Sequence, residues 1–307
     1  NGPIGGIRVG QIDGEWVINP TYAAREKSAL DLTISGTPDR VLMIEAGAKE
    51  VSEKDVFDAI LFGQKHLKPV MKLIDDVVKK VGKEKLTVEA LMQEDADVAA
   101  EKKEMAEKAK KFLKEHIDQY LFASPKTSKG SRKDAKDDLK NQLDEYLKSE
   151  QIGKDKRKWA LEVFDDIVEA RVAEAILKEN KRVDGRKLDE IRPLSVETSY
   201  LPRVHGSGLF ARGETQVLSI VTLGSPGDEQ TLDGMEENGK KRYMHHYNFP
   251  PYSVGDIKPL RGPSRRDIGH GALAEKALLP MLPTKEEFPY TIRVVSEVLG
   301  SNGSSSM

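Results

Sequence analysis

Two adjacent arginines stand where a helix is expected to begin, and they could hold a phosphate group. Arg265 and Arg266 are followed by Asp267, which suits a first helical turn, and by His270 between two glycines. Free N–H groups and the dipole make a helix N-terminus favourable for anions. Neighbouring guanidinium groups repel each other unless a polyanion joins them. The segment therefore indicates a site for a backbone phosphate; the alternatives are an ion pair with Asp267 or Glu275 and a structural role for His270.

Three consecutive serines form a second candidate site. Ser304, Ser305 and Ser306 follow Gly303, after an alternating apolar segment that predicts a strand over residues 291–298. Small hydroxyl groups and backbone N–H groups can surround an oxyanion, because all of them donate and no bulky side chain blocks the approach. Flexible linkers have the same composition. The strand in front of the serines favours the anion-binding loop.

A third candidate is the turn at Arg212, Gly213 and Glu214, directly before the apolar segment 216–223, which predicts a buried strand. The planar guanidinium group of an arginine can offer two parallel donors to a phosphate. Glu214 is an equally suitable local counter-ion. The turn is therefore either a phosphate contact or a structural ion pair.

Paired histidines, His245 and His246, suggest a metal site at first sight. Adjacent strand residues point to opposite faces, however, so the two side chains cannot easily share one ion, and no third ligand is evident nearby. The aromatic and proline-rich stretch 247–262 follows them. It is interpreted either as a surface on which nucleic-acid bases stack or as a packed loop.

The composition excludes several protein classes. The 307 residues carry 49 basic and 51 acidic side chains, a formal charge of −2, which fits neither a basic coat protein nor an acidic tail. Cysteine is absent, so thiol nucleophiles and Cys-ligated metals are excluded. No apolar run approaches the ~18 residues of a membrane span. Without a recognisable secretory signal, a cytoplasmic location is expected.

Three segments of different character follow one another along the chain. Residues 1–85 are mixed, with a hairpin expected at 30–35 and 41–44, then a helix capped by Ser52 in which Pro69 marks a kink or a boundary. Residues 86–180 contain three apolar stripes at helical spacing, which predict a small helical bundle; the stripes span 101–121, 134–149 and 155–178. Its lysine-rich faces are interpreted as solvated surface rather than an RNA-binding patch. Residues 181–307 return to mixed structure.

Seven sequence words, in this order, resemble those of the polynucleotide phosphorylase family. They are NGPIGGIRVG at 1–10, RVDGR at 182–186, LPRVHGS at 201–207, RGETQ at 212–216, HYNFPPYSVG at 246–255, IGHG at 268–271, and the terminal segment 293–307. The resemblance implies an α+β fold, in which partial ribonuclease PH-like domains flank a small all-α bundle. Its expected divisions are 1–85, the C-terminal part of the first such domain; 86–180, the helical domain; and 181–307, the N-terminal part of the second.

The family phosphorolyses RNA from its 3′ end and releases nucleoside diphosphates, in a reversible reaction carried out by a homotrimer. The resemblance therefore implies RNA, inorganic phosphate and nucleoside diphosphates as partners. Residue by residue, it implies catalytic roles for Arg265, Arg266 and His270, phosphate binding by Ser304, Ser305 and Ser306, and RNA binding by Arg212, Arg265 and Arg266. The family's Mg²⁺ ligands have no counterparts in this chain, so no metal ligand is expected and the chain is expected to be inactive alone. The alternatives are a non-catalytic RNA-binding or scaffold subunit and an interaction module centred on residues 86–180.

Overall fold

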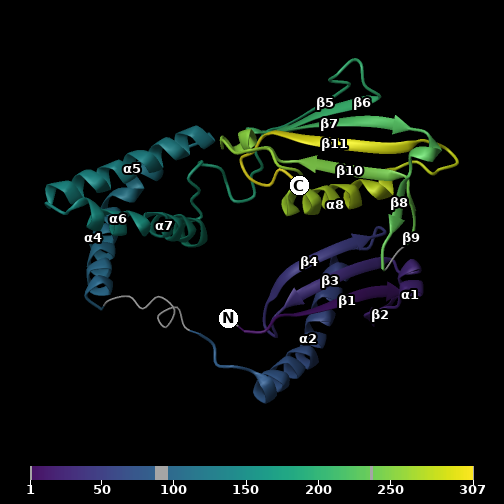
Figure 1. The fold of residues 1–307 in the computed structure, drawn as a ribbon, viewed down its shortest axis with the longest axis horizontal. Helices are drawn as coiled ribbons and strands as arrows, with labels where there is room; N and C mark the ends of the chain where they lie inside the picture. Colours follow the sequence, from purple (N-terminus) through teal and green to yellow (C-terminus); the bar gives the residue numbers. More distant parts are fainter. Residues whose placement is uncertain (1, 87–95, 236–237, 307) are drawn as a thin grey trace. The chain divides into compact units, whose positions relative to one another are not determined.

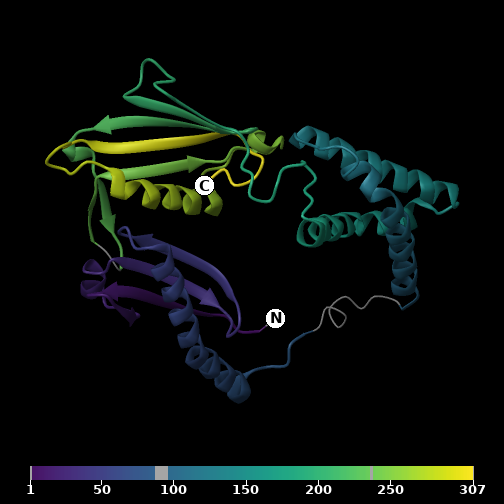
Figure 2. The ribbon, with the colours of Figure 1, turned by 180° about the vertical axis from the view of Figure 1, so that it is seen from behind.

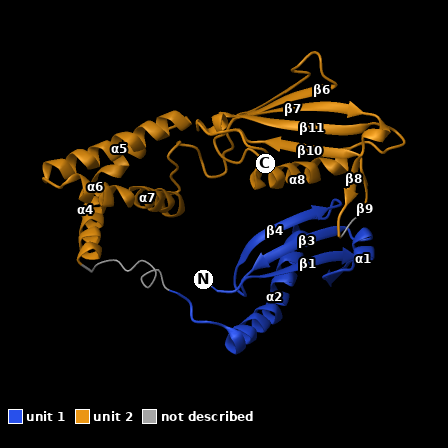
Figure 3. Cartoon of the chain, in the orientation of Figure 1, with its two compact units in different colours: residues 1–93 blue, residues 94–307 orange. Residues whose placement is uncertain are grey.

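A computed structural model describes residues 2–86, 96–235 and 238–306 of the chain. They fold into two compact units, Asn1–Gln93 and Glu94–Met307 (Figure 3). Each unit combines helices with a largely antiparallel sheet, so the expected α+β class is confirmed (Figure 1). The boundary expected near residue 180 stays a prediction.

The first unit is a four-stranded antiparallel sheet with a long helix on one face. Its strand order is β2-β1-β3-β4. The predicted hairpin is confirmed, since β3 pairs with β4 from Leu30 opposite Ala48 to Gly36 opposite Val41. The elements are β1 (Gly5–Ile12), β2 (Glu15–Ile18), α1 (Tyr22–Glu26), β3 (Leu30–Gly36), β4 (Val41–Ala48) and α2 (Glu53–Val81).

Helix α2 begins as predicted at Ser52, whose hydroxyl accepts a hydrogen bond from the Asp55 N–H group at 3.1 Å. Pro69 lies inside this helix, so the alternative of a helix boundary there was wrong. A helix runs past a proline when packing along its length outweighs the lost hydrogen bond. Here α2 covers an alternating apolar face, and the cluster beneath it contains Ile7, Val9, Leu30, Leu32, Ile34, Ala59 and Leu67.

The second unit begins with helices that pack around a continuous apolar core. They are α4 (Ala96–Leu121), α5 (Lys129–Ser149), α6 (Lys154–Glu162) and α7 (Phe164–Glu179), and their buried residues include Leu113, Ile117, Leu139, Leu143 and Phe164. The predicted bundle is confirmed, but its third stripe divides into α6 and α7. Val163 ends one helix and starts the next in a right-handed conformation (φ −88°, ψ −2°), so the apolar spacing continues across the break.

A five-stranded sheet in the order β10-β11-β7-β6-β5 completes the second unit. Its strands are β5 (Leu194–Thr198), β6 (Gly206–Arg212), β7 (Thr215–Gly224), β10 (Tyr243–Asn248) and β11 (Thr291–Gly300). The strands predicted at 216–223 and 291–298 are thus confirmed, and they pair antiparallel. Strand β10 pairs parallel with β11, and α8 (Arg265–Leu278) crosses between them and lies against β10 (Figures 1 and 2). A separate hairpin consists of β8 (Gln230–Asp233) and β9 (Asn238–Lys241).

Candidate anion-binding site

The three serines lie in a tight loop at the end of β11. Gly303 has φ +83° and Ser304 has φ +53°, so two consecutive residues adopt the left-handed conformation. Glycine takes this conformation freely, whereas a serine needs support from its surroundings. That support comes from the Arg212 guanidinium group, which donates to the carbonyl oxygen of Ser304 at 2.6 Å and more weakly to that of Gly303 at 3.4 Å.

Arg212 therefore contacts the loop backbone, and the alternative of an ion pair with Glu214 was wrong. The Glu214 carboxylate instead accepts hydrogen bonds from the Lys129 N–H group at 2.7 Å and from the Asn302 amide at 3.1 Å. The Nε atom of Arg212 is buried and has no hydrogen-bond partner in the described part of the chain. The turn thus places Arg212 beside the serines, where its guanidinium group stabilises the loop through the carbonyl oxygens of Gly303 and Ser304.

Tyr247 joins the serine loop to the helix that carries the two arginines. Its hydroxyl group lies 2.6 Å from the Ser305 hydroxyl, and its ring contacts the edge of the His270 ring at a centroid distance of 5.1 Å. Burial raises the pKa of Tyr247, although the hydrogen bond with Ser305 works in the opposite direction. The phenol is therefore neutral at physiological pH and can share a hydrogen bond with Ser305.

The sequence predicts that Arg265 and Arg266 precede a helix start; in the structure they occupy the first turn of α8 itself. Ser264 and Asp267 cap this helix reciprocally. The Arg266 guanidinium group lies over the Phe249 ring, 4.6 Å from its centroid. Burial opposes ionisation of Asp267, but hydrogen bonds from Ser264 and the Phe249 N–H group, and then the charge of Arg266, hold the pKa of Asp267 below its ordinary value.

Neither arginine forms the ion pair that was the structural alternative. Asp267 is engaged by the cap, and Glu275 pairs with Lys241 at 2.6 Å and accepts from the His245 N–H group. No carboxylate in the described residues lies in ion-pair range of Arg265 or Arg266, and both side chains are exposed. Two unpaired guanidinium groups beside a helix N-terminus offer an open surface to an anion.

The predicted residues thus converge through two aromatic side chains that were not singled out individually. Tyr247 and Phe249 stack at a centroid distance of 6.2 Å. One touches Ser305 and His270, and the other lies under Arg266. Their spacing in the sequence could have indicated them: Phe249 follows Tyr247 by two positions at the end of β10, and residues two apart in an extended segment lie on the same face. His270 Nδ1 is buried and has no hydrogen-bond partner in the described residues.

Arginines from distant segments add further positive charge. The Arg192 guanidinium group donates to the Asn302 carbonyl oxygen at 3.0 Å, and Arg132 on α5 donates to the Asn302 side chain at 2.7 Å. Lys129, at the start of α5, donates to the Ser301 carbonyl oxygen at 3.4 Å. Sequence analysis missed these residues, because their partners lie 110, 170 and 172 positions away.

The His245 ring is bound within the sheet. The His245 ring lies 2.8 Å from both the Tyr243 hydroxyl and the Ser296 hydroxyl, so both of its nitrogens are used. Burial lowers the pKa of His245. In residues 2–86, 96–235 and 238–306 there is no cluster of three or more His, Asp or Glu side chains suited to a metal ion. Within the same ranges no helix has both the length and the apolar character needed to cross a bilayer.

Two models of the 3′ exoribonuclease family match the chain: the domain 2 model matches residues 2–66 and the domain 1 model matches residues 190–307. Polyribonucleotide nucleotidyltransferases from Finegoldia magna and Geobacillus kaustophilus are 47% and 48% identical to it over 305 residues, 99% of the chain. The chain spans 41% of the length of each of these relatives.

A solved chain of the archaeoglobus fulgidus exosome with RNA bound to the active site is also similar, at 19% identity and a TM-score of 0.38, over 47% of this chain and 57% of that chain. That overlap is too low to support a structural argument. The two family models and the similarity of nearly the whole chain to polyribonucleotide nucleotidyltransferases show that the chain belongs to the 3′ exoribonuclease family.

Proposed function

We propose that the longer protein containing this chain is a phosphate-dependent 3′–5′ exoribonuclease, and that residues 303–306 bind its inorganic phosphate. The observation that supports this most directly is the contact between Tyr247 and Ser305, which joins the serine loop to the helix bearing the arginines. A phosphate on that loop and an RNA phosphate beside α8 would then be close enough to react.

The proposed reaction is a phosphoryl transfer with simple atom balance. An oxygen of inorganic phosphate attacks the phosphorus of the terminal phosphodiester, and the bond from that phosphorus to the 3′ oxygen of the preceding nucleotide breaks. The products are a nucleoside diphosphate and an RNA shortened by one residue with a free 3′ hydroxyl. Such chemistry depends chiefly on positioning and on charge neutralisation, for which guanidinium and N–H donors are suited.

The residues divide between these two tasks. Ser304, Ser305 and Ser306 would surround the attacking phosphate, with their loop held by Arg212. Arg265 and Arg266 would bind the RNA phosphates, because both are exposed and unpaired. His270, whose ring contacts that of Tyr247, would contact the phosphate or ribose.

Several properties of the longer protein belong to the same proposal. They are Mg²⁺ dependence, a homotrimeric state, a cytoplasmic location and a role in mRNA degradation. The described residues of this chain offer no set of three metal ligands, so no step is assigned to Mg²⁺ here. This chain alone is expected not to turn over RNA.

The test uses the longer protein with a short RNA, with and without inorganic phosphate. Nucleoside diphosphates that form only when phosphate is supplied are the expected product, measured by anion-exchange chromatography. Ser305→Ala should chiefly raise the phosphate concentration required, whereas Arg265→Ala with Arg266→Ala should weaken RNA binding and flatten its salt dependence. Nucleoside monophosphates released without phosphate, or RNA binding with no turnover at all, would rule out the phosphorolytic assignment.

A further inference from the structure

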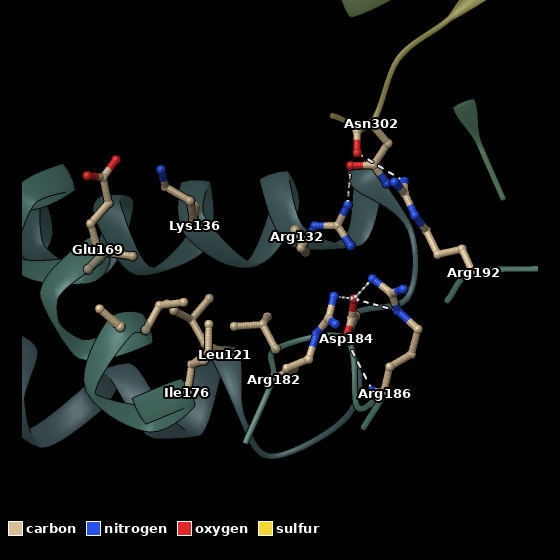
Figure 4. A pocket seen from close by; sticks show the side chains of 14 residues that line it. Leu121, Arg132, Lys136, Glu169, Ile176, Arg182, Asp184, Arg186, Arg192 and Asn302 are labelled. Carbon is tan, nitrogen blue, oxygen red and sulfur yellow. Dashed lines mark hydrogen bonds and ion pairs between the residues drawn. The ribbon is translucent and has the colours of Figure 1, made fainter. Parts of the chain in front are cut away.

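A cavity of about 600 Å³ lies within the second unit, between the helices and the segment that leads into β5. One side is largely apolar: it is formed by Leu121, Val168, Val172, Ala173 and Ile176, with the Glu169 side chain beside them (Figure 4). The other side carries guanidinium groups, which gather around Asp184 and Asn302 (Figure 4). Its volume falls within the ~300–1,000 Å³ of typical small-molecule sites.

The positive charge in this cavity is only partly neutralised. Asp184 pairs with Arg186 at 2.7 Å and with Arg182 at 3.3 Å. Arg132 and Arg192, by contrast, donate only to neutral oxygen atoms in the described part of the chain. Lys136 at the rim already has a partner, Asp165, at 2.7 Å. Two guanidinium groups therefore face the cavity without a carboxylate.

Arg192 is the most crowded of these groups. Burial, followed by the charges of Arg212, Arg186 and Arg132, lowers the pKa of Arg192. The Asp184 carboxylate opposes this shift, and a guanidinium group nevertheless stays charged under all ordinary conditions. A bound anion would relieve the repulsion among these guanidinium groups.

We propose that this cavity binds a nucleoside polyphosphate, with its phosphates on Arg132 and Arg192 and its nucleoside against the apolar wall of α7. Guanidinium groups bind phosphate oxygens through paired donors and can also lie flat on a planar base. The apolar wall favours a ligand with an organic part over a purely inorganic anion, because burying that part removes apolar surface from water.

The position of Asn302 connects this cavity to the serine loop. Arg132 and Arg192 hold Asn302 by its side chain and its carbonyl oxygen, and the next residue is Gly303. A ligand that draws these two guanidinium groups toward its phosphates weakens their hold on Asn302. Nucleotide binding and phosphate binding at the loop should therefore oppose each other, each reducing the affinity of the other by the same factor. This consequence rests on the proposed function, whereas binding in the cavity does not.

The test measures ATP binding to the 307-residue chain by titration calorimetry, with no RNA present. Ala173→Trp should weaken ATP binding at least tenfold, because Ala173 is exposed at the cavity wall and a larger side chain fills the space. The matched control is Leu177→Trp on the same helix, which is exposed, does not line the cavity and should leave binding unchanged. Arg132→Gln should also weaken binding about tenfold, and tripolyphosphate should bind at least tenfold more weakly than ATP.

Each contrary result has a definite meaning. ATP binding that persists in Ala173→Trp would place the nucleotide elsewhere and overturn the proposal, as would the absence of ATP binding by a chain whose circular dichroism is native. Tripolyphosphate that binds as tightly as ATP would overturn the assignment of a nucleoside. A longer protein that fails to phosphorolyse RNA would contradict the proposed function but would not change these titrations.

Discussion

The two main sheets of this protein differ in the size of the apolar core that packs against them. The sheet of the first unit buries Val9, Leu30, Leu32 and Ile34 completely beneath α2. The larger sheet of the second unit has a buried apolar cluster of three residues, Tyr243, Ile292 and Val294.

Polar side chains show the opposite distribution. Of the six buried polar side chains among the described residues, five lie in or beside the second sheet: Thr215, Ser253, Thr291, Ser296 and Ser301. Apolar burial supplies most of the stability of a fold, whereas buried hydrogen bonds fix geometry at a modest net gain. The sheet that carries the candidate site therefore has a smaller apolar cluster and more buried hydrogen-bonding side chains, which fix the geometry of the site.

The largest expected effect comes from removing a matched isoleucine from each core. Ile34→Ala in β3 should lower the free energy of unfolding of the first unit by about 2–5 kcal/mol, since it leaves a cavity in fully buried surroundings. Ile292→Ala in β11 should fall at the low end of that range, because its smaller cluster can relax. Hydrogen exchange followed by mass spectrometry reads β3 and β11 separately. Equal losses in the two sheets would contradict the comparison.

A second pair compares glycines in the helices that cover the two sheets. A Cβ atom on Gly63 of α2 would lie 2.5 Å from Ile34 Cδ1 and 2.8 Å from Val9 Cγ2, whereas one on Gly269 of α8 would meet nothing within 4 Å. Gly63→Ala should therefore destabilise the first unit by about 1–3 kcal/mol through overpacking.

Gly269→Ala should be neutral or stabilise α8 by up to about 1 kcal/mol, because alanine is the better helix former. Denaturant unfolding followed by far-ultraviolet circular dichroism measures both glycine variants. Similar destabilisation by the two substitutions would mean that Gly269 is packed against a neighbour and does not face open space.

A smaller effect should follow from loss of the hydroxyl group that joins the two parts of the site. Tyr247→Phe keeps the ring contacts with His270 and Phe249 but removes the hydrogen bond to Ser305, which is worth about 0.5–1.5 kcal/mol. Phosphate binding, measured by calorimetry, should weaken roughly two- to tenfold.

The control for this variant is Tyr252→Phe, which removes an exposed hydrogen bond to Glu297 and should leave phosphate binding unchanged. An unaltered phosphate affinity in Tyr247→Phe would show that the hydrogen bond between Tyr247 and Ser305 does not contribute to phosphate binding by the serine loop.

The smallest expected effect is a pH dependence of stability that arises from a histidine in the second sheet. Burial lowers the pKa of His245; Glu275 opposes the shift and His246 adds to it. The unfolded chain then binds a proton that the folded chain resists, so stability is complete above about pH 6.5 and falls as the pH decreases below it. His245→Gln should reduce this loss, measured as urea midpoints at pH 7.5 and 5.5, although His246 retains a contribution of the same sign. If the urea midpoint falls by the same amount between pH 7.5 and 5.5 in His245→Gln as in the unaltered chain, the pH dependence comes from other groups.

Local patterns alone determined much of this protein. The hairpin at β3 and β4, the strands β7 and β11, and the helix start at Ser52 all follow from periodicity and capping, which act between residues a few positions apart. The serine loop and the arginine pair could be proposed for the same reason, because hydroxyl and guanidinium groups indicate anion binding wherever they cluster.

Only the tertiary structure decided which of these groups meet. The hydrogen bond from Arg212 to the Ser304 carbonyl oxygen and the grouping of Arg132 and Arg192 around Asn302 cannot be read from nearby residues. Their contacts join residues about 90 to 170 positions apart, and strand register and helix docking bring such distant atoms to within 3 Å. Spacing along the chain carries no information about a partner at that separation, whereas the packing of the whole unit selects one.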